Sequence, residues 1–136
     1  MTAAHDPEPE RQLPGLLRSY LAARHAGRYA DAAALFAPDA VVVDDGGTHV
    51  GIDAITAWVV ESATAVEHTT TVLGHTVVDA TTVDVLVRID GAFPGGTATL
   101  RQRFTTDYGV IRRLTIEPAS DPDLGLRPGP PGPARG

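Results

Sequence analysis

Residues 35–55 constrain the fold more than any other stretch, because a helix end, a strand, a turn and a new helix follow one another there. The β-branched run Val41–Val43 predicts a strand. The sequence Asp-Asp-Gly-Gly at residues 44–47 is typical of a tight turn, and Gly51 begins a second helical pattern. One acid, Asp44, therefore stands at the end of an apolar strand, where it is either a turn residue or a partly buried base.

The rest of the chain places helices first and strands afterwards. Apolar residues at helical spacing predict helices over residues 13–27, 29–35 and 51–65. Segments rich in Thr and Val, or alternating between apolar and polar residues, predict strands over residues 68–78, 82–93, 97–106 and 110–117. Helices followed by an antiparallel meander indicate an α+β fold with the helices packed on one face of a curved sheet.

The two ends of the chain differ in composition from its middle. Residues 1–12 are rich in Pro and Glu, and residues 119–136 are rich in Pro and Gly. Such segments bury too little apolar surface to offset the entropy lost on ordering, so we expect both to be disordered. The predicted folded domain is residues 13–118, and one domain is the expectation for a chain of 136 residues.

Composition narrows the classes of function. The chain has no cysteine, which excludes a thiol nucleophile and thiolate metal ligands, and its five histidines show no metal-binding spacing. No phosphate-binding glycine loop is present, so we expect no cofactor. The net charge of −6 argues against nucleic-acid binding. A polar N-terminus and the lack of long apolar runs predict a cytoplasmic protein without a membrane partner.

Four arginines on the last two predicted strands suggest a charged surface. Arg101 and Arg103 share one face of their strand, and Arg112 and Arg113 lie on the next strand. We expect a basic stripe on the outer surface of the sheet, either solvated or at a dimer interface, with an anion site as the alternative.

Four short segments carry a resemblance to a known family. They are Tyr-Leu-Ala-Ala-Arg-His-Ala-Gly at 20–27, Leu-Phe-Ala-Pro-Asp-Ala at 35–40, Gly-Ile-Asp-Ala-Ile at 51–55 with Trp58, and Gly-Val-Ile-Arg-Arg-Leu at 109–114. With them, residues 13–117 resemble the nuclear-transport-factor-2-like superfamily, which includes ketosteroid isomerases and SnoaL-like polyketide cyclases. The resemblance implies three N-terminal helices packed on a strongly curved, mostly antiparallel sheet. It further implies a cone with an internal pocket for a hydrophobic small molecule, and a homodimer formed through the sheet.

The resemblance also implies roles for two residues. Asp44 falls where ketosteroid isomerases keep their general base, and Tyr20 falls where they keep a tyrosine that donates to the developing oxyanion. A carboxylate desolvated by Val43 and its neighbours accepts a proton more readily, and a phenol facing it can stabilise an enolate. Two alternatives stay open, since Asp44 can serve only the turn and Tyr20 can be a packed core residue.

One part of the isomerase pattern is missing. That pattern has a second oxyanion donor, a protonated acid, on the strand before the last, and SnoaL-like cyclases also tend to place an acid there. The corresponding residues 97–104 contain no Asp or Glu. Leu100 fills the position, and Gln102 is the nearest polar residue of the same strand parity. The known isomerase and cyclase arrangements are therefore incomplete in this chain.

The expected pocket walls follow from the apolar faces of the helices and strands. The candidates for substrate binding are Trp58, Val59, Val85, Val87, Leu100, Gln102, Phe104 and His68. For the pocket mouth itself, either His49 or His68 is the candidate. The leading hypothesis is a cofactor-free enzyme that moves a proton next to a carbonyl of a polyketide- or steroid-like molecule, giving isomerisation, cyclisation or dehydration. The alternatives are a non-catalytic module that binds an apolar ligand and a dimeric interaction protein with a closed pocket.

Overall fold

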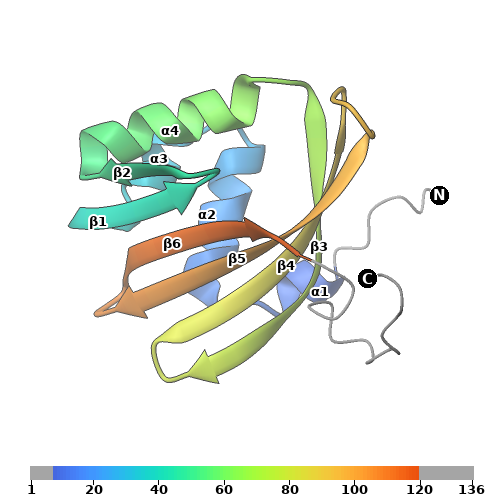
Figure 1. The fold of residues 1–136 in the computed structure, drawn as a ribbon. Coiled ribbons are helices and arrows are strands. Elements are labelled where there is room, and N and C mark those ends of the chain that lie inside the picture. Colours follow the sequence, from blue (N-terminus) through green and yellow to red (C-terminus); the bar gives the residue numbers. More distant parts are fainter. Residues whose placement is uncertain (1–7, 120–136) are drawn as a thin grey trace.

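The computed structural model describes residues 8–119, which form helices on one side of a curved sheet (Figure 1). Residues 1–7 and the predicted Pro/Gly-rich tail from residue 120 lie outside the described residues. In chain order the elements are α1 (Glu8–Arg11), α2 (Gly15–His25), α3 (Tyr29–Ala33), β1 (Phe36–Asp44), β2 (Gly47–Val50), α4 (Ile52–Thr64), β3 (His68–Asp79), β4 (Thr82–Gly91), β5 (Thr97–Asp107) and β6 (Val110–Pro118).

The six strands form one open sheet in the order β2-β1-β6-β5-β4-β3. Every neighbouring pair is antiparallel except β1 and β6, which run parallel. The long strands β3, β4 and β5 bend strongly, and helices α2 and α4 lie on the concave side (Figure 1). The predicted α+β class and the mostly antiparallel, curved sheet are confirmed. None of the helices within residues 8–119 is both long and apolar enough to cross a membrane.

Two boundaries differ from the expectation. Residues 8–11 of the predicted disordered segment form α1, because Arg11 pairs with Glu8 at 2.7 Å within one helical turn. Strand β1 begins at Phe36, well before the predicted start at Val41, and includes Pro38. A proline is tolerated there because the pairing with β6 shifts register between Phe36 and Val41, where the ladder is interrupted.

The core forms where one row of the concave face meets helix α2. Val42, Leu114, Phe104 and Val83 stand in register across β1, β6, β5 and β4, and each is buried. The ring of Tyr20 packs edge-on against Phe104 at a centroid distance of 5.7 Å. Because side chains alternate along a strand, the same face continues two residues further along, to the row that contains Asp44.

The outer face of the sheet is not a continuous basic stripe. Arg103 donates two hydrogen bonds to the Asp84 carboxylate, at 2.7 and 2.9 Å, from the adjacent strand. Arg101 pairs with Glu117 at 2.7 Å, directly opposite on β6. Cross-strand acids therefore balance these two arginines, and the predicted basic stripe is interrupted there.

Candidate active site

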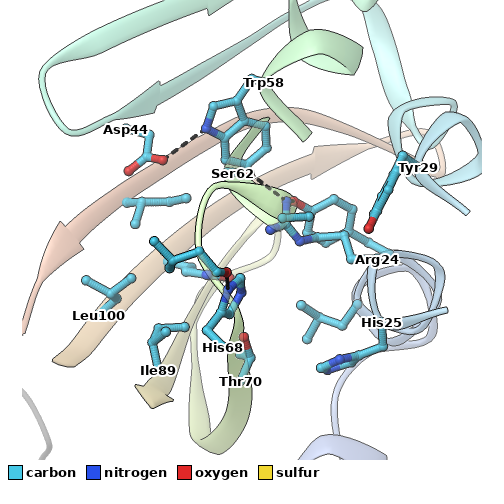
Figure 2. A pocket seen from close by; sticks show the side chains of 16 residues that line it. Arg24, His25, Tyr29, Asp44, Trp58, Ser62, His68, Thr70, Ile89 and Leu100 are labelled. Carbon is cyan, nitrogen blue, oxygen red and sulfur yellow. Dashed lines mark hydrogen bonds between the residues drawn. The ribbon is translucent and has the colours of Figure 1, made fainter. Parts of the chain in front are cut away.

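A cavity of about 340 Å³ lies between helices α2 and α4 and the concave face of the sheet (Figure 2). This volume falls within the range that holds small organic ligands. Its polar lining consists of Tyr20, Arg24, His25, Tyr29, Asp44, Trp58, Ser62, His68, Thr70 and Gln102. Its apolar lining consists of Leu21, Ala63, Val66, Ile89, Leu100 and Ile116.

Asp44 reaches this cavity because its neighbours make the turn. Asp45 and Gly46 both have positive φ, 54° and 80°, as a two-residue hairpin with a type I′ turn requires. Asp44 instead pairs with Gly47 as the last residues of the β1–β2 ladder. Its side chain shares the strand face of buried Val42, so it points to the concave side and lines the cavity.

The Asp44 carboxylate is anchored by the indole of Trp58. Trp58 Nε1 donates to Asp44 Oδ2 at 2.9 Å, from helix α4 to the end of β1 (Figure 2). Within residues 8–119 no other group donates to this carboxylate, so its second oxygen is available to a ligand. Trp58, predicted to bind substrate, therefore both lines the cavity and orients the acid.

Tyr20 combines the two roles that the sequence left open. Its ring is buried against Phe36 and Phe104, and the residue also lines the cavity, where its hydroxyl accepts a hydrogen bond from Arg24. Burial raises the pKa of the Tyr20 phenol, the nearby Arg24 guanidinium opposes that rise, and the Asp44 charge adds to it. The phenol therefore keeps its proton at neutral pH and can donate it in a hydrogen bond to a ligand oxygen.

Arg24 is a lining residue that the sequence prediction missed. Its Nη1 donates to Ser62 Oγ at 3.2 Å and to the Tyr20 hydroxyl at 3.4 Å. Its guanidinium also lies over the Tyr20 and Trp58 rings, 5.9 and 5.4 Å from their centroids. The spacing of four residues from Tyr20 on one helix could have revealed it, because such residues share a helix face.

The sheet side of the cavity follows the strand register. Asp44 pairs with Ile116, and Ile116 pairs with Gln102, so the three side chains form one row across β1, β6 and β5. Gln102 Oε1 is buried and has no hydrogen-bond partner within residues 8–119. A ligand hydroxyl or N–H group can therefore satisfy it. Leu100, also predicted to bind substrate, lines the cavity two residues earlier on the same face.

His68 lines the cavity at the start of β3, whereas His49, the other candidate for the pocket mouth, is not among the lining residues. The Nδ1 of His68 lies 2.8 Å from the Val66 carbonyl oxygen. A carbonyl only accepts, so Nδ1 is the donor of this hydrogen bond.

Four of the predicted wall residues lie elsewhere. Val59, Val85, Val87 and Phe104 have no exposed surface and belong to the core rather than to the cavity lining. The strand face was correctly assigned for the three strand residues, but the same concave face runs from the cavity into the packed core. The alternation of side chains along a strand identifies the face of the sheet but not whether a residue is packed in the core or lines the cavity. The sequence therefore could not separate core residues from lining residues.

Metal binding has no obvious location in the described part of the chain. Between residues 8 and 119, no three His, Asp or Glu side chains converge closely enough to hold a metal ion.

Comparison with known proteins agrees with this geometry. The sequence profile of the SnoaL-like domain family matches residues 17–113. A candidate polyketide cyclase from Sinorhizobium meliloti, known from its crystal structure, is 35% identical to this chain with a TM-score of 0.74. That alignment covers 79% of this chain and 98% of the other. The family resemblance seen in the sequence is confirmed.

Two more distant crystal structures share the fold. A candidate ketosteroid isomerase from Kribbella flavida is 19% identical, with a TM-score of 0.67, over 96% of this chain and 88% of its own. A hypothetical protein with a ketosteroid-isomerase-like fold from Catenulispora acidiphila is 18% identical, with a TM-score of 0.69, over 85% and 96%. Comparison with curated proteins finds no match.

Proposed function

Because this chain belongs to the SnoaL-like domain family, we propose that it is an enzyme that transfers a proton next to a carbonyl group. The substrate is a hydrophobic, polyketide- or steroid-like small molecule, and the outcome is isomerisation, cyclisation or dehydration. One observation carries the proposal: Asp44 and Tyr20 line the same cavity, and the Asp44 charge acts on the Tyr20 phenol. A base and a hydrogen-bond donor facing one ligand are the two groups that enolate chemistry requires.

In the proposed mechanism, Asp44 removes a proton from the carbon next to the carbonyl. The C–H bonding electrons move into a new C=C bond, and the carbonyl oxygen becomes an enolate oxygen that accepts a hydrogen bond from Tyr20. Protonated Asp44 then returns the proton to another carbon, which completes an isomerisation. In a cyclisation the enolate carbon attacks a second carbonyl, which takes up the proton; in a dehydration the proton leaves with a β-hydroxyl as water.

Leu100 fills the position where the isomerase pattern has an acid, and Gln102 supplies an amide two residues further along the same strand face. Its buried, unpartnered oxygen favours a ligand with a donor group near the reacting carbonyl. An amide stabilises an oxyanion less strongly than a protonated acid does, so we expect activated carbonyl compounds rather than simple ketones as substrates.

A non-catalytic binding module is the second candidate. It is favoured by the cavity lining, in which Asp44 is the one carboxylate and already accepts a hydrogen bond from Trp58. The third hypothesis, an interaction protein with a closed pocket, has no support from a cavity of about 340 Å³.

Deuterium exchange with the bicyclic ketone 2-tetralone tests the enzyme against the binding module. Loss of its α-proton signals in D₂O is followed by NMR, for the wild type and for Asp44→Asn. The asparagine still accepts the Trp58 hydrogen bond but cannot take a proton, so the enzyme-dependent exchange rate should fall by about 10²–10⁴. Equal rates for the two proteins would exclude Asp44 as the base.

Asp45→Asn is the matched control. It makes the same chemical change one residue away, on an exposed turn position where asparagine tolerates positive φ. The exchange rate of Asp45→Asn should equal that of the wild type.

We further propose a homodimer formed through the sheet and a cytoplasmic location. The edge strand β3 exposes Leu73, Val77 and Val78, and such apolar surface is commonly covered by a partner. Light scattering coupled to gel filtration tests the dimer, and a monomeric mass at micromolar concentration would contradict it.

A further inference from the structure

The Arg24 guanidinium has an unusual environment for a permanent cation. It is half-buried and lies between two aromatic rings, and its two hydrogen-bond acceptors, Ser62 and Tyr20, are both neutral (Figure 2). An arginine side chain cannot lose its proton at any physiological pH, so it always brings a positive charge into the cavity wall.

No acid in the described part of the chain neutralises this charge. Arg24 takes part in none of the ion pairs formed within residues 8–119. Both of its hydrogen bonds leave from Nη1, so the N–H groups of Nε and Nη2 remain for a ligand. These two nitrogens present parallel donors that match the two oxygens of a carboxylate.

Trp58 keeps the cation and the base of the cavity apart. The indole N–H binds Asp44, while the face of the same ring lies 5.4 Å from the Arg24 guanidinium carbon. The two charges therefore contact one rigid side chain without pairing with each other. A ligand that enters between them meets a cation at one position and a carboxylate at another.

The charge of the cavity lining also differs from that of the whole chain. The protein carries a formal net charge of −6 with its histidines neutral, yet in the cavity lining the one acid, Asp44, is matched by Arg24. The lining is therefore less negative than the protein as a whole, and Arg24 provides a local positive charge that attracts an anion.

We propose that the cavity selects carbonyl compounds that carry a carboxylate, with Arg24 binding the carboxylate and the acidic C–H group facing Asp44. A keto acid is the substrate class that places both groups in one small molecule. The part that concerns Asp44 rests on the proposed function; the binding of a carboxylate by Arg24 does not depend on it.

Paired probes of equal shape test the anion site. Benzoate and benzamide differ in charge but hardly in size, and Trp58 is the single tryptophan of the chain, so its indole N–H signal reports their binding in NMR titrations. Wild-type protein should bind benzoate at least tenfold more tightly than benzamide. Arg24→Gln should weaken benzoate binding by about ten- to hundredfold and leave benzamide binding within twofold.

Two further variants serve as controls, one expected to tighten benzoate binding and one expected to change no affinity. Asp44→Asn removes the one negative charge of the lining and should tighten benzoate binding. Arg28→Gln removes an equal charge from an exposed arginine that pairs with Asp31 outside the cavity lining, and should leave both affinities unchanged.

Benzamide, the neutral probe, distinguishes structural damage in a variant from specific loss of the anion site. If Arg24→Gln weakens benzoate and benzamide equally, or if the wild type binds both with equal affinity, Arg24 only braces the aromatic rings and the proposal is wrong. Arg24→Lys, which keeps the charge but loses the paired donors, should retain an intermediate preference for benzoate. Selective benzoate binding in a protein whose Asp44→Asn variant exchanges 2-tetralone normally would disprove the proposed base and leave the anion site intact.

Discussion

Trp58 donates its indole N–H to the Asp44 carboxylate across 2.9 Å, which joins the middle of helix α4 to the last residue of strand β1. The same ring lies beneath the guanidinium of Arg24. One buried aromatic side chain thus sets the positions of both the candidate base and the cation of the cavity.

Trp58→Phe should distinguish the hydrogen bond that orients Asp44 from the packing of the aromatic ring. The variant keeps an aromatic ring but leaves the half-buried Asp44 carboxylate without its donor. We expect the free energy of unfolding to fall by about 1 to 2 kcal/mol and proton exchange to slow, because the carboxylate loses its orientation. Urea unfolding followed by circular dichroism and 2-tetralone exchange measure the two effects. Tyr29→Phe, which removes another polar group from the cavity lining, should change neither strongly. Unchanged exchange in Trp58→Phe would show that the indole does not position the base.

Tyr20 should control the stability of the protein at alkaline pH. Burial raises its pKa in the native state above the ordinary 10.0, so between these two values the unfolded chain loses a proton that the native state keeps. This contribution to stability is complete below pH 10 and is lost as the pH rises through the native pKa. The chain has no lysine, so the tyrosines are the side chains that titrate in this range.

The measurement is urea unfolding at pH 8 and pH 11. The wild type should lose more stability over this interval than Tyr20→Phe does. Tyr108→Phe serves as the control, since Tyr108 is 94% exposed and should follow the wild type. Parallel losses in the wild type and Tyr20→Phe would mean that the phenol is not protected in the native state.

Gly91→Ala should destabilise the strand pair that carries His68. A Cβ at Gly91 would lie 2.6 Å from the Glu67 carbonyl oxygen and 2.7 Å from the His68 Cβ, so the start of β3 must move. We expect a loss of about 1 to 3 kcal/mol and weaker ligand binding, because His68 moves with that backbone. Gly74 lies on β3, the strand of His68, and a Cβ added there would have no atom within 4 Å. Gly74→Ala should therefore cost less than about 0.5 kcal/mol. Thermal unfolding of both variants tests this expectation, and equal melting temperatures would contradict the expected clash at Gly91.

Phe104 and Leu100 share one face of β5, but we expect Phe104 to determine the stability of the protein and Leu100 its affinity for the ligand. Phe104 is fully buried beneath Tyr20, so Phe104→Leu should lower the free energy of unfolding by about 1 to 2 kcal/mol and change benzamide affinity little. Leu100 lines the cavity, so Leu100→Ala should change ligand affinity more than stability. Urea unfolding and benzamide titration of both variants test the pair. The reverse pattern would mean that the cavity extends to Phe104.

Sequence alone predicted the order of elements and the family, because these depend on short-range patterns. Helical periodicity, β-branched runs and the Asp44–Gly47 turn each arise from neighbours along the chain. The same patterns brought Asp44 and Tyr20 forward as candidates, and both line the cavity. Helix α1 was missed because one short turn has no periodicity to detect.

Tertiary structure decided which residues meet a ligand. The positive φ of Asp45 assigned the turn to that residue and left Asp44 on the concave face, a choice between adjacent identical residues that composition cannot make. Strand parity placed Val85 and Gln102 on the same face, but the packing of helices above the sheet decided that one is core and the other lining. Arg24 became part of the site because α4 brings Ser62 and Trp58 to it. Contacts of this kind join distant segments, and their geometry depends on the packed fold rather than on local sequence.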